Sequence, residues 1–248
     1  MKLPFVLSGG GVRGFAHLGV LKAFSERDIY PAVITSTSAG SIIGAMICDG
    51  YGVEEIMDLA IKNKLYGFEW TFPMVGLMSL KPLKDFLTKY LRHKNLEDLP
   101  TPLYVTATNL LDGRQEIFSK GDVVQAVIAS CSIPMIFPPV TINNVPYIDG
   151  GFSSNLPIEP LLGGYEDIVG VHVNPLPDYN PLASITEHIE RLGILSIREN
   201  VMRNMSRCTI FIEPPALAKY RLFDEKKKQL IYDEGYNYTK QYLDTKHQ

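Results

Sequence analysis

Five hydroxyl side chains lie within the seven residues Thr35–Ser41, and one of them could act as a catalytic nucleophile. Nucleophilic serines often occupy the centre of the frame Gly-x-Ser-x-Gly, on a sharp turn between a strand and a helix. The corresponding frame here reads STSAG, so Ser38 takes the central position and Ser36 replaces the first glycine. Ala39 and Gly40 are the small neighbours that such a turn needs, and Ser36 is nearly as small. The frame therefore makes Ser38 a candidate nucleophile.

The same serine also has a structural interpretation. Serine and threonine are common helix N-caps, and on its own the frame fits a cap as well as a nucleophile. The stretch Ala39–Cys48 that follows is apolar nearly all round, which predicts a helix buried in the core. Such a helix would hold Ser38 rigidly, and this favours the catalytic interpretation.

The glycine-rich segment SGGGVRG, Ser8–Gly14, allows three interpretations. A dinucleotide-binding loop shares the spacing G-x-G-x-x-G, but it requires an acidic residue at the end of the second strand. The predicted second strand ends in Thr35 and Ser36 instead, which argues against a nucleotide cofactor. A plain tight turn is the second interpretation. The third is an oxyanion hole, because the N–H groups of consecutive glycines can converge on a developing negative charge beside a helix N-terminus.

A candidate base lies in the motif YIDGGFSSNLP, where Asp149 ends a predicted strand and Gly150 and Gly151 follow. An Asp-Gly pair is more often a plain turn, so the catalytic interpretation depends on Ser38 needing a base. None of the five histidines is an obvious alternative. His172 lies in the middle of a predicted strand, where packing is the expected role, and it is the one histidine retained as a triad candidate.

The elements that must position these residues follow from the hydrophobic pattern. Short apolar runs at 3–7 and 32–35 predict buried strands, and each is followed by a helical pattern. This order predicts a parallel sheet with right-handed crossovers. Turn signals at Asp112-Gly113 and Asn143-Asn144 predict two hairpins. The remaining elements expected are strands within 167–173 and 208–214 and helices over 15–28, 53–64, 82–93, a segment capped by Asp122, 182–206 and 225–243. We therefore expect one α/β domain over residues 1–248, in three layers, with a mostly parallel central sheet and helices on both faces.

The composition argues against several classes of protein. The chain has 248 residues, of which 46% are hydrophobic and 21% charged, and a net charge of −3 that provides no basic face for nucleic acid. The three cysteines, Cys48, Cys131 and Cys208, are widely spaced and odd in number, which indicates neither a disulfide framework nor a metal site. No apolar run is long enough for a membrane span or a signal peptide, so we expect a cytoplasmic protein.

Taken in order, GGGVRG with FAHLGVL, then STSAG, then DGG with NLP, the sequence resembles the patatin-like phospholipase family. Each motif is weak alone, whereas the ordered set over residues 9–157 is specific. The resemblance implies a serine hydrolase that cleaves carboxylic esters of lipids through a Ser-Asp dyad, without a metal or other cofactor. Ser38 would be the nucleophile and Asp149 the base. The other positions that the resemblance implies are Gly9, Gly10, Gly11, Arg13 and Gly14 in the oxyanion hole, Ser36, Ala39 and Gly40 in the nucleophile turn, and Gly150 and Gly151 after the base.

Three further stretches could meet a lipid substrate, and two rival functions stay open. The apolar stretch 65–80 fits a lipid-facing flap or a buried connection, the segment 133–140 leads toward Asp149 and could line the same cleft, and the lysines of 226–228 could touch headgroups or simply be solvated. The Arg13 side chain could bind a lipid phosphate, but we favour a role in bracing its loop. The rivals are an acyltransferase, which would use His172 with Ser38, and a non-catalytic lipid- or protein-binding module. The sequence does not indicate an oligomeric state.

Overall fold

The computed structural model describes residues 1–63, 78–182, 184–222 and 224–246. Its strands are β1 (Lys2–Leu7), β2 (Tyr30–Thr37), β3 (Leu103–Asn109), β4 (Gln115–Phe118), β5 (Val140–Ile142), β6 (Val145–Asp149), β7 (Val169–Val171) and β8 (Ile210–Ile212). Its α-helices are α1 (Phe15–Ser25), α2 (Ala39–Cys48), α3 (Val53–Lys62), α4 (Lys81–Tyr90), α5 (Val123–Ser130), α6 (Gly151–Ser154), α7 (Ile185–Met205) and α8 (Lys228–Lys246). Short 3₁₀ turns lie at Gly11–Gly14, Leu96–Asp98, Glu159–Leu161, Pro215–Lys219 and Glu225–Lys227.

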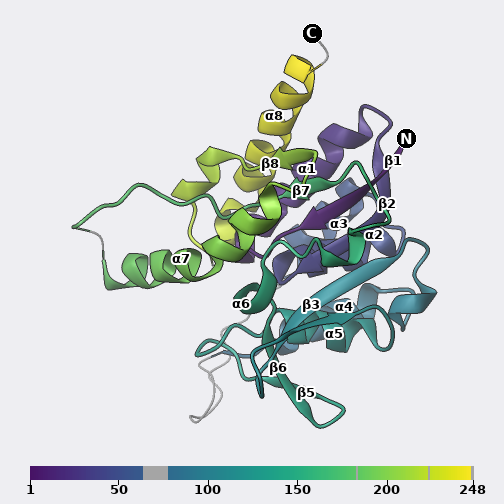
Figure 1. The fold of residues 1–248 in the computed structure, drawn as a ribbon, viewed down its shortest axis with the longest axis vertical. Coiled ribbons are helices and arrows are strands. Elements are labelled where there is room, and N and C mark those ends of the chain that lie inside the picture. Colours follow the sequence, from purple (N-terminus) through teal and green to yellow (C-terminus); the bar gives the residue numbers. More distant parts are fainter. Residues whose placement is uncertain (64–77, 183, 223, 247–248) are drawn as a thin grey trace.

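The strands form one eight-stranded sheet in the order β5-β6-β3-β2-β1-β7-β8, with β4 paired to β3 outside this path. Strands β3, β2, β1, β7 and β8 run parallel, and β4, β5 and β6 are antiparallel additions. Both predicted hairpins are therefore confirmed, as β3-β4 and β5-β6. The mixed α/β fold with a helix-flanked sheet is also as expected (Figure 1).

The two faces of the sheet are covered unequally. Side chains alternate between faces along a strand, and in β1 the residues Leu3, Phe5 and Leu7 join the larger core cluster, to which α1 to α5 and α8 contribute. Val6 points the other way, into a smaller cluster with the 156–161 segment and Val201 of α7. Helices thus lie on both faces, and α7 is the long helix that covers the smaller cluster.

The register of β3 determines where the two candidate catalytic residues meet. Thr37, the last residue of β2, pairs with Thr106, and Asp149, the last residue of β6, pairs with Ala107. Strand β4 pairs with residues 105–108 along one edge of β3. Strands β2 and β6 both overlap this range, so both must pair with the other edge of β3, where their ends meet. The turn after Thr37 is therefore adjacent to Asp149.

Three of the sequence expectations require comment. The stretch 65–80 lies mostly outside the described residues, although Met78 and Leu80 at its end are buried. In the lysine run, Lys228 is nearly buried and donates to the Ala60 carbonyl oxygen at 3.0 Å, so it is not a solvated side chain. No helix in the described ranges combines the length and the apolar character that crossing a bilayer requires.

Candidate active site

Ser38 lies alone on the turn between β2 and α2, in a strained backbone conformation. Its φ of 50° and ψ of −123° fall in a region that residues with a side chain rarely adopt, at a cost of about 1–3 kcal/mol. Within the part of the chain that the structure describes, its side chain makes no capping hydrogen bond to α2. The Ser38 carbonyl oxygen accepts instead from the N–H and the hydroxyl of Ser41, at 2.8 and 2.6 Å. The N-cap interpretation is therefore wrong, and the strained turn presents a hydroxyl that does not cap the helix.

Two hydrogen bonds anchor this turn to the neighbouring strand. The Ser38 N–H donates to Ser130 Oγ at 2.7 Å, and the Ser130 hydroxyl donates to the Thr106 carbonyl oxygen at 2.6 Å. Ser130 is the last residue of α5, so α5 and β3 together hold the strained residue. The sequence offered no signal for this role of Ser130, because it depends on how α5 packs.

The replacement of the first frame glycine has a simple physical explanation. Ser36 is an ordinary strand residue, paired with Leu7 and Val105, so no positive φ is required there. Its hydroxyl donates to the Tyr104 carbonyl oxygen at 3.0 Å. A serine therefore fits this position without distorting the turn.

The last glycine of the frame cannot be replaced so easily. A Cβ on Gly40 would lie 2.4 Å from the Leu7 carbonyl oxygen and 2.7 Å from that of Ser8. Ala39 is similarly close to the glycine-rich loop, since a Cβ on Gly14 would lie 2.7 Å from the Ala39 Cβ. Small residues at these positions let the start of α2 pack directly against the end of β1 and the loop after it.

Asp149 is buried beside Ser38, and each of the two side chains is only 6% exposed. Asp149 Oδ1 accepts from the Gly151 N–H at 2.8 Å, whereas Oδ2 is buried with no hydrogen-bond partner of standard geometry among the described residues. Burial raises the pKa of Asp149 from its usual 3.8 to about 6, although the nearby Ser38 hydroxyl and the Gly151 N–H favour the charged form. A carboxyl with this pKa can accept a proton near neutral pH.

The backbone after Asp149 must pass very close to β3. A Cβ on Gly150 would lie 2.2 Å from the Thr106 carbonyl oxygen, so only glycine fits. Gly151 then turns its N–H back to the Asp149 carboxylate. The two glycines that follow the candidate base thus place its carboxylate and supply one of its hydrogen bonds.

The glycine-rich loop offers fewer free donors than the sequence suggested. The Gly9 N–H donates to Asn155 Oδ1 at 3.2 Å, and the Arg13 N–H donates to the Gly10 carbonyl oxygen at 3.1 Å. Both N–H groups therefore already have an acceptor in this structure. The N–H groups of Gly10 and Gly11 have no recorded acceptor in the described ranges, and both residues line the cavity that contains Ser38.

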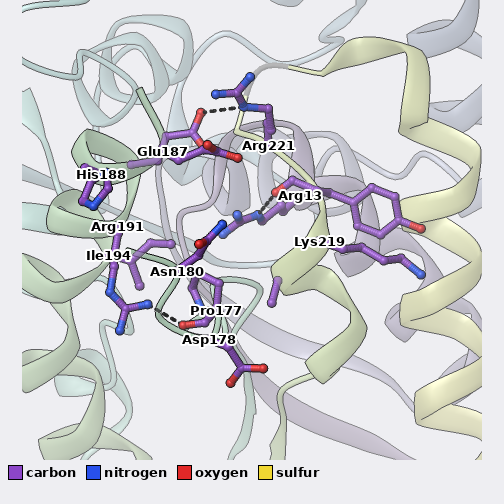
Figure 2. Close-up of a pocket in the computed structure, with 13 residues that line it drawn as sticks. Arg13, Pro177, Asp178, Asn180, Glu187, His188, Arg191, Ile194, Lys219 and Arg221 are labelled. Atoms are coloured by element: carbon purple, nitrogen blue, oxygen red, sulfur yellow. Dashed lines mark hydrogen bonds and ion pairs between the residues drawn. The ribbon is translucent and has the colours of Figure 1, made fainter. Parts of the chain in front are cut away.

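Arg13 braces the loop through its side chain, as favoured from the sequence. Its guanidinium is buried, and Nε donates to the Tyr220 carbonyl oxygen at 2.8 Å while Nη1 donates to Asn174 Oδ1 at 3.4 Å. Burial lowers the pKa of Arg13 to about 10, with Glu190 acting in the opposite direction, so the group stays charged at neutral pH. Figure 2 shows this side chain extending among residues of α7 and of the segment that precedes α8.

Two asparagines connect the loop, the candidate base and α7. Asn155 accepts from the Gly9 N–H through its side chain and donates its own backbone N–H to Asn200 Oδ1 at 3.0 Å. Asn200, on α7, donates through Nδ2 to the Gly151 carbonyl oxygen at 3.1 Å. Asn155 was visible in the motif NLP, whereas Asn200 lies far along the chain in a helix without any such motif.

The candidate histidine lies elsewhere. His172 Nδ1 is 2.6 Å from Glu213 Oε1, and no histidine is among the described residues that line the Ser38 cavity. His17 is fully buried and donates through Nε2 to the Ser8 carbonyl oxygen at 2.8 Å. Burial lowers the pKa of His17 to about 4, so it stays neutral. A Ser-His pair built on Ser38 is therefore not what this structure contains.

The cavity around Ser38 has a volume of about 110 Å³, enough for several water molecules. Its polar part is formed by Ser38, Asp149 and the glycine-rich loop. Its apolar part is formed by Ile133, Phe152, Ile194, Ile197 and Leu222. The expectation that the segment 133–140 lines the cleft is confirmed for Ile133. No three His, Cys, Asp or Glu side chains in the described part of the chain lie close enough together to hold a metal ion.

Solved structures with this fold are found among bacterial proteins. The chain resembles VipD from Legionella pneumophila, with a TM-score of 0.57 and 15% sequence identity, over 98% of this chain and 67% of that one. It also resembles ExoU, in the ExoU-SpcU complex of Pseudomonas aeruginosa, with a TM-score of 0.51 and 16% identity, over 98% of this chain and 51% of that one. At this level of identity the likeness concerns the fold.

Sequence comparison gives the family. Lysophospholipase nte1 of Aspergillus niger is 30% identical over 274 aligned residues, which cover 96% of this chain and 18% of that protein. Lysophospholipase NTE1 of Saccharomyces cerevisiae is 27% identical, over 97% of this chain and 16% of that protein. The chain thus spans under a fifth of the length of these relatives. The family model described as patatin-like phospholipase matches residues 5–162, more than half of the chain. This chain belongs to the patatin-like phospholipase family.

Proposed function

We propose that the chain hydrolyses carboxylic esters of lipids, such as phospholipids or lysophospholipids, with Ser38 as nucleophile and Asp149 as base. One observation carries the proposal. A serine that does not cap the following helix lies on a strained turn, next to a buried carboxyl whose Oδ2 has no hydrogen-bond partner of standard geometry among the described residues. A pKa of about 6 suits Asp149 to this role, because it is charged at neutral pH and can still return the proton. The family membership and the names of the curated relatives support the choice of lipid esters.

The reaction would proceed in two steps. Asp149 accepts the proton of Ser38 as the hydroxyl oxygen attacks the ester carbonyl, and the N–H groups of Gly10 and Gly11 stabilise the oxyanion. The intermediate then expels the alcohol, which takes the proton from Asp149, and leaves an acyl group on Ser38. In the second step Asp149 accepts a proton from water, which attacks the acyl group, and the proton returns to Ser38. No histidine takes part.

The test is the loss of a single hydroxyl. Ser38→Ala is expected to lower hydrolysis of a soluble ester such as p-nitrophenyl butyrate on the order of 10⁴-fold or more. A fluorophosphonate probe should label wild type on Ser38 and leave Ser38→Ala unlabelled. Ser206→Ala provides a matched control, since Ser206 is exposed at the end of α7 and bonds to the Arg203 carbonyl oxygen. Normal turnover by Ser38→Ala would refute the proposal, and absence of an adduct on wild type would favour a binding module.

The cellular location is a separate proposal. The thiols of Cys48, Cys131 and Cys208 are all free, which suits a reducing compartment such as the cytoplasm. Fractionation of cells that express the protein would test this directly. Recovery from an oxidising compartment would contradict it.

A further inference from the structure

The N-terminal half of α7 exposes a stripe of large apolar side chains. Ile185, Ile189 and Leu192 are 80%, 58% and 64% exposed, and Leu195 is 43% exposed. Their spacing of four, three and three residues places them along one side of the helix. We call these four residues the outer face of α7. Figure 1 shows this end of α7 projecting away from the sheet.

The neighbouring side of the same helix belongs to the candidate active site. Ile194 and Ile197 form part of the apolar wall of the cavity that contains Ser38. One turn further on, Asn200 holds the backbone of Gly151, next to Asp149. Ser196 also lines this cavity and follows Leu192 by four residues, so the outer face adjoins the part of the helix that walls the cavity. Phe152, which also lines the cavity and is 49% exposed, adds apolar surface at its mouth.

Charge on α7 is balanced. The helix carries three acidic residues, Glu187, Glu190 and Glu199, and three arginines, Arg191, Arg198 and Arg203. Attachment through this helix would therefore depend on burial of apolar area and not on attraction to anionic headgroups. Attachment through α7 would therefore differ from attachment through the lysines near the start of α8, which would favour anionic lipid.

We propose that the outer face of α7 binds the surface of a phospholipid bilayer and thereby places the mouth of the Ser38 cavity at the lipid. The proposal rests on the proposed function, because phospholipid esters reside in a lipid phase and must reach the cavity from it. An amphipathic helix at such an interface buries its apolar side roughly 5–10 Å deep, into the region where the ester groups of phospholipids lie. The partner is a lipid surface, since the exposed stripe is continuous with the wall of the lipid-ester site.

The experiment measures vesicle binding without catalysis. Ser38→Ala protein, which cannot consume the lipid, is sedimented with phosphatidylcholine vesicles, alone and with added Ile189→Gln and Leu192→Gln. Glutamine keeps both the helix propensity and the net charge. Since each lost side chain weakens partitioning about tenfold, the double substitution should weaken vesicle binding about a hundredfold. Added salt or added phosphatidylserine should change wild-type binding little.

Matched controls come from the opposite end of the parallel strands. Tyr30 begins β2, and Leu162 precedes β7, and they are 47% and 44% exposed. Tyr30→Gln with Leu162→Gln should leave vesicle binding unchanged. With Ser38 restored, the α7 variant should hydrolyse p-nitrophenyl butyrate normally, because Ile189 and Leu192 do not line the cavity. Normal turnover also shows that α7 is folded.

The outcomes are separable from those of the proposed function. Equal vesicle binding by the α7 variant and its parent would overturn the proposal, as would binding that requires phosphatidylserine. A lipid-free dimer that the α7 substitutions dissociate would also overturn it, because the outer face would then be covered by a second copy. If Ser38→Ala kept esterase activity, the assignment of Ser38 would fail while the sedimentation result would stand.

Discussion

Replacing Asp149 by asparagine should stabilise the folded protein at neutral pH while it abolishes activity. The carboxylate is buried beside Ser38, and burial is the main reason why its pKa rises from 3.8 to about 6. Because the folded state holds this proton more tightly than the unfolded chain, the contribution of Asp149 to stability is greatest below about pH 4 and falls as pH rises to about 6. Above this range the folded protein keeps a charged group in a site that disfavours charge.

The size of this effect follows from the two pKa values. A difference of about 2 in pKa corresponds to about 3 kcal/mol at pH 7.5, and to only about 0.5 kcal/mol at pH 4. Asparagine keeps an oxygen to accept from the Gly151 N–H and places its amide where Oδ2 has no described partner. The amide brings its own desolvation cost of about 1–3 kcal/mol, but that cost is the same at both pH values. The difference between the two measurements therefore isolates the charge.

The assay is urea unfolding followed by circular dichroism, for wild type and Asp149→Asn at about pH 7.5 and about pH 4. We expect the asparagine variant to gain about 2–3 kcal/mol relative to wild type between the lower and the higher pH. Asp58→Asn, at an exposed position on α3, should change stability by less than about 0.5 kcal/mol. A stability difference for Asp149→Asn that is equal at both pH values would refute the reasoning, since burial of the charge would then have no measurable cost.

Two further predictions concern the same region. The value of kcat/KM for a soluble ester should fall about tenfold per pH unit below about pH 6, because the base must be charged, and a rate that stays flat down to about pH 4.5 would exclude Asp149 as the base. Gly40→Ala should destabilise the protein by about 1–3 kcal/mol or more, since its Cβ would lie 2.4 Å from the backbone oxygen of Leu7. Gly164→Ala, where a Cβ meets no atom within 4 Å, should stay within about 0.5 kcal/mol of wild type. Urea unfolding of both glycine variants beside wild type measures the two effects.

The sequence predicted those features that depend on local pattern. The first strands and helices could be predicted because apolar runs, glycines and turn pairs mark their ends. Ser38 and Asp149 were paired through the family resemblance, and the structure places the strands that lead to them end to end. The ends of β7 and β8 were harder to predict from the sequence, because these two strands pair over only three residues.

Features that depend on tertiary contacts could not be predicted. The glycine-rich loop showed many N–H groups, but which of them are free depends on Asn155 and on the fold of the loop itself. The contributions of Ser130 and Asn200 were equally hidden, since neither lies near a motif. At Ser36 the sequence suggested a difficulty that the structure does not contain. The serine replaces the usual glycine, but it lies in a strand and its hydroxyl donates to the carbonyl oxygen of Tyr104 in the neighbouring strand.

The chain of hydrogen bonds from Gly9 through Asn155 and Asn200 to Gly151 has a consequence for how much of the polypeptide a working site needs. The segment matched by the family model ends at residue 162 and contains both Ser38 and Asp149. A chain cut there would lose Asn200, strand β7, which pairs with β1, and three of the apolar residues that line the cavity, Ile194, Ile197 and Leu222. It would keep both proposed catalytic residues, but it would expose the edge of the strand that leads into the glycine-rich loop, and exposed strand edges favour aggregation. The complete site therefore requires the C-terminal third of the chain as well as the two motifs.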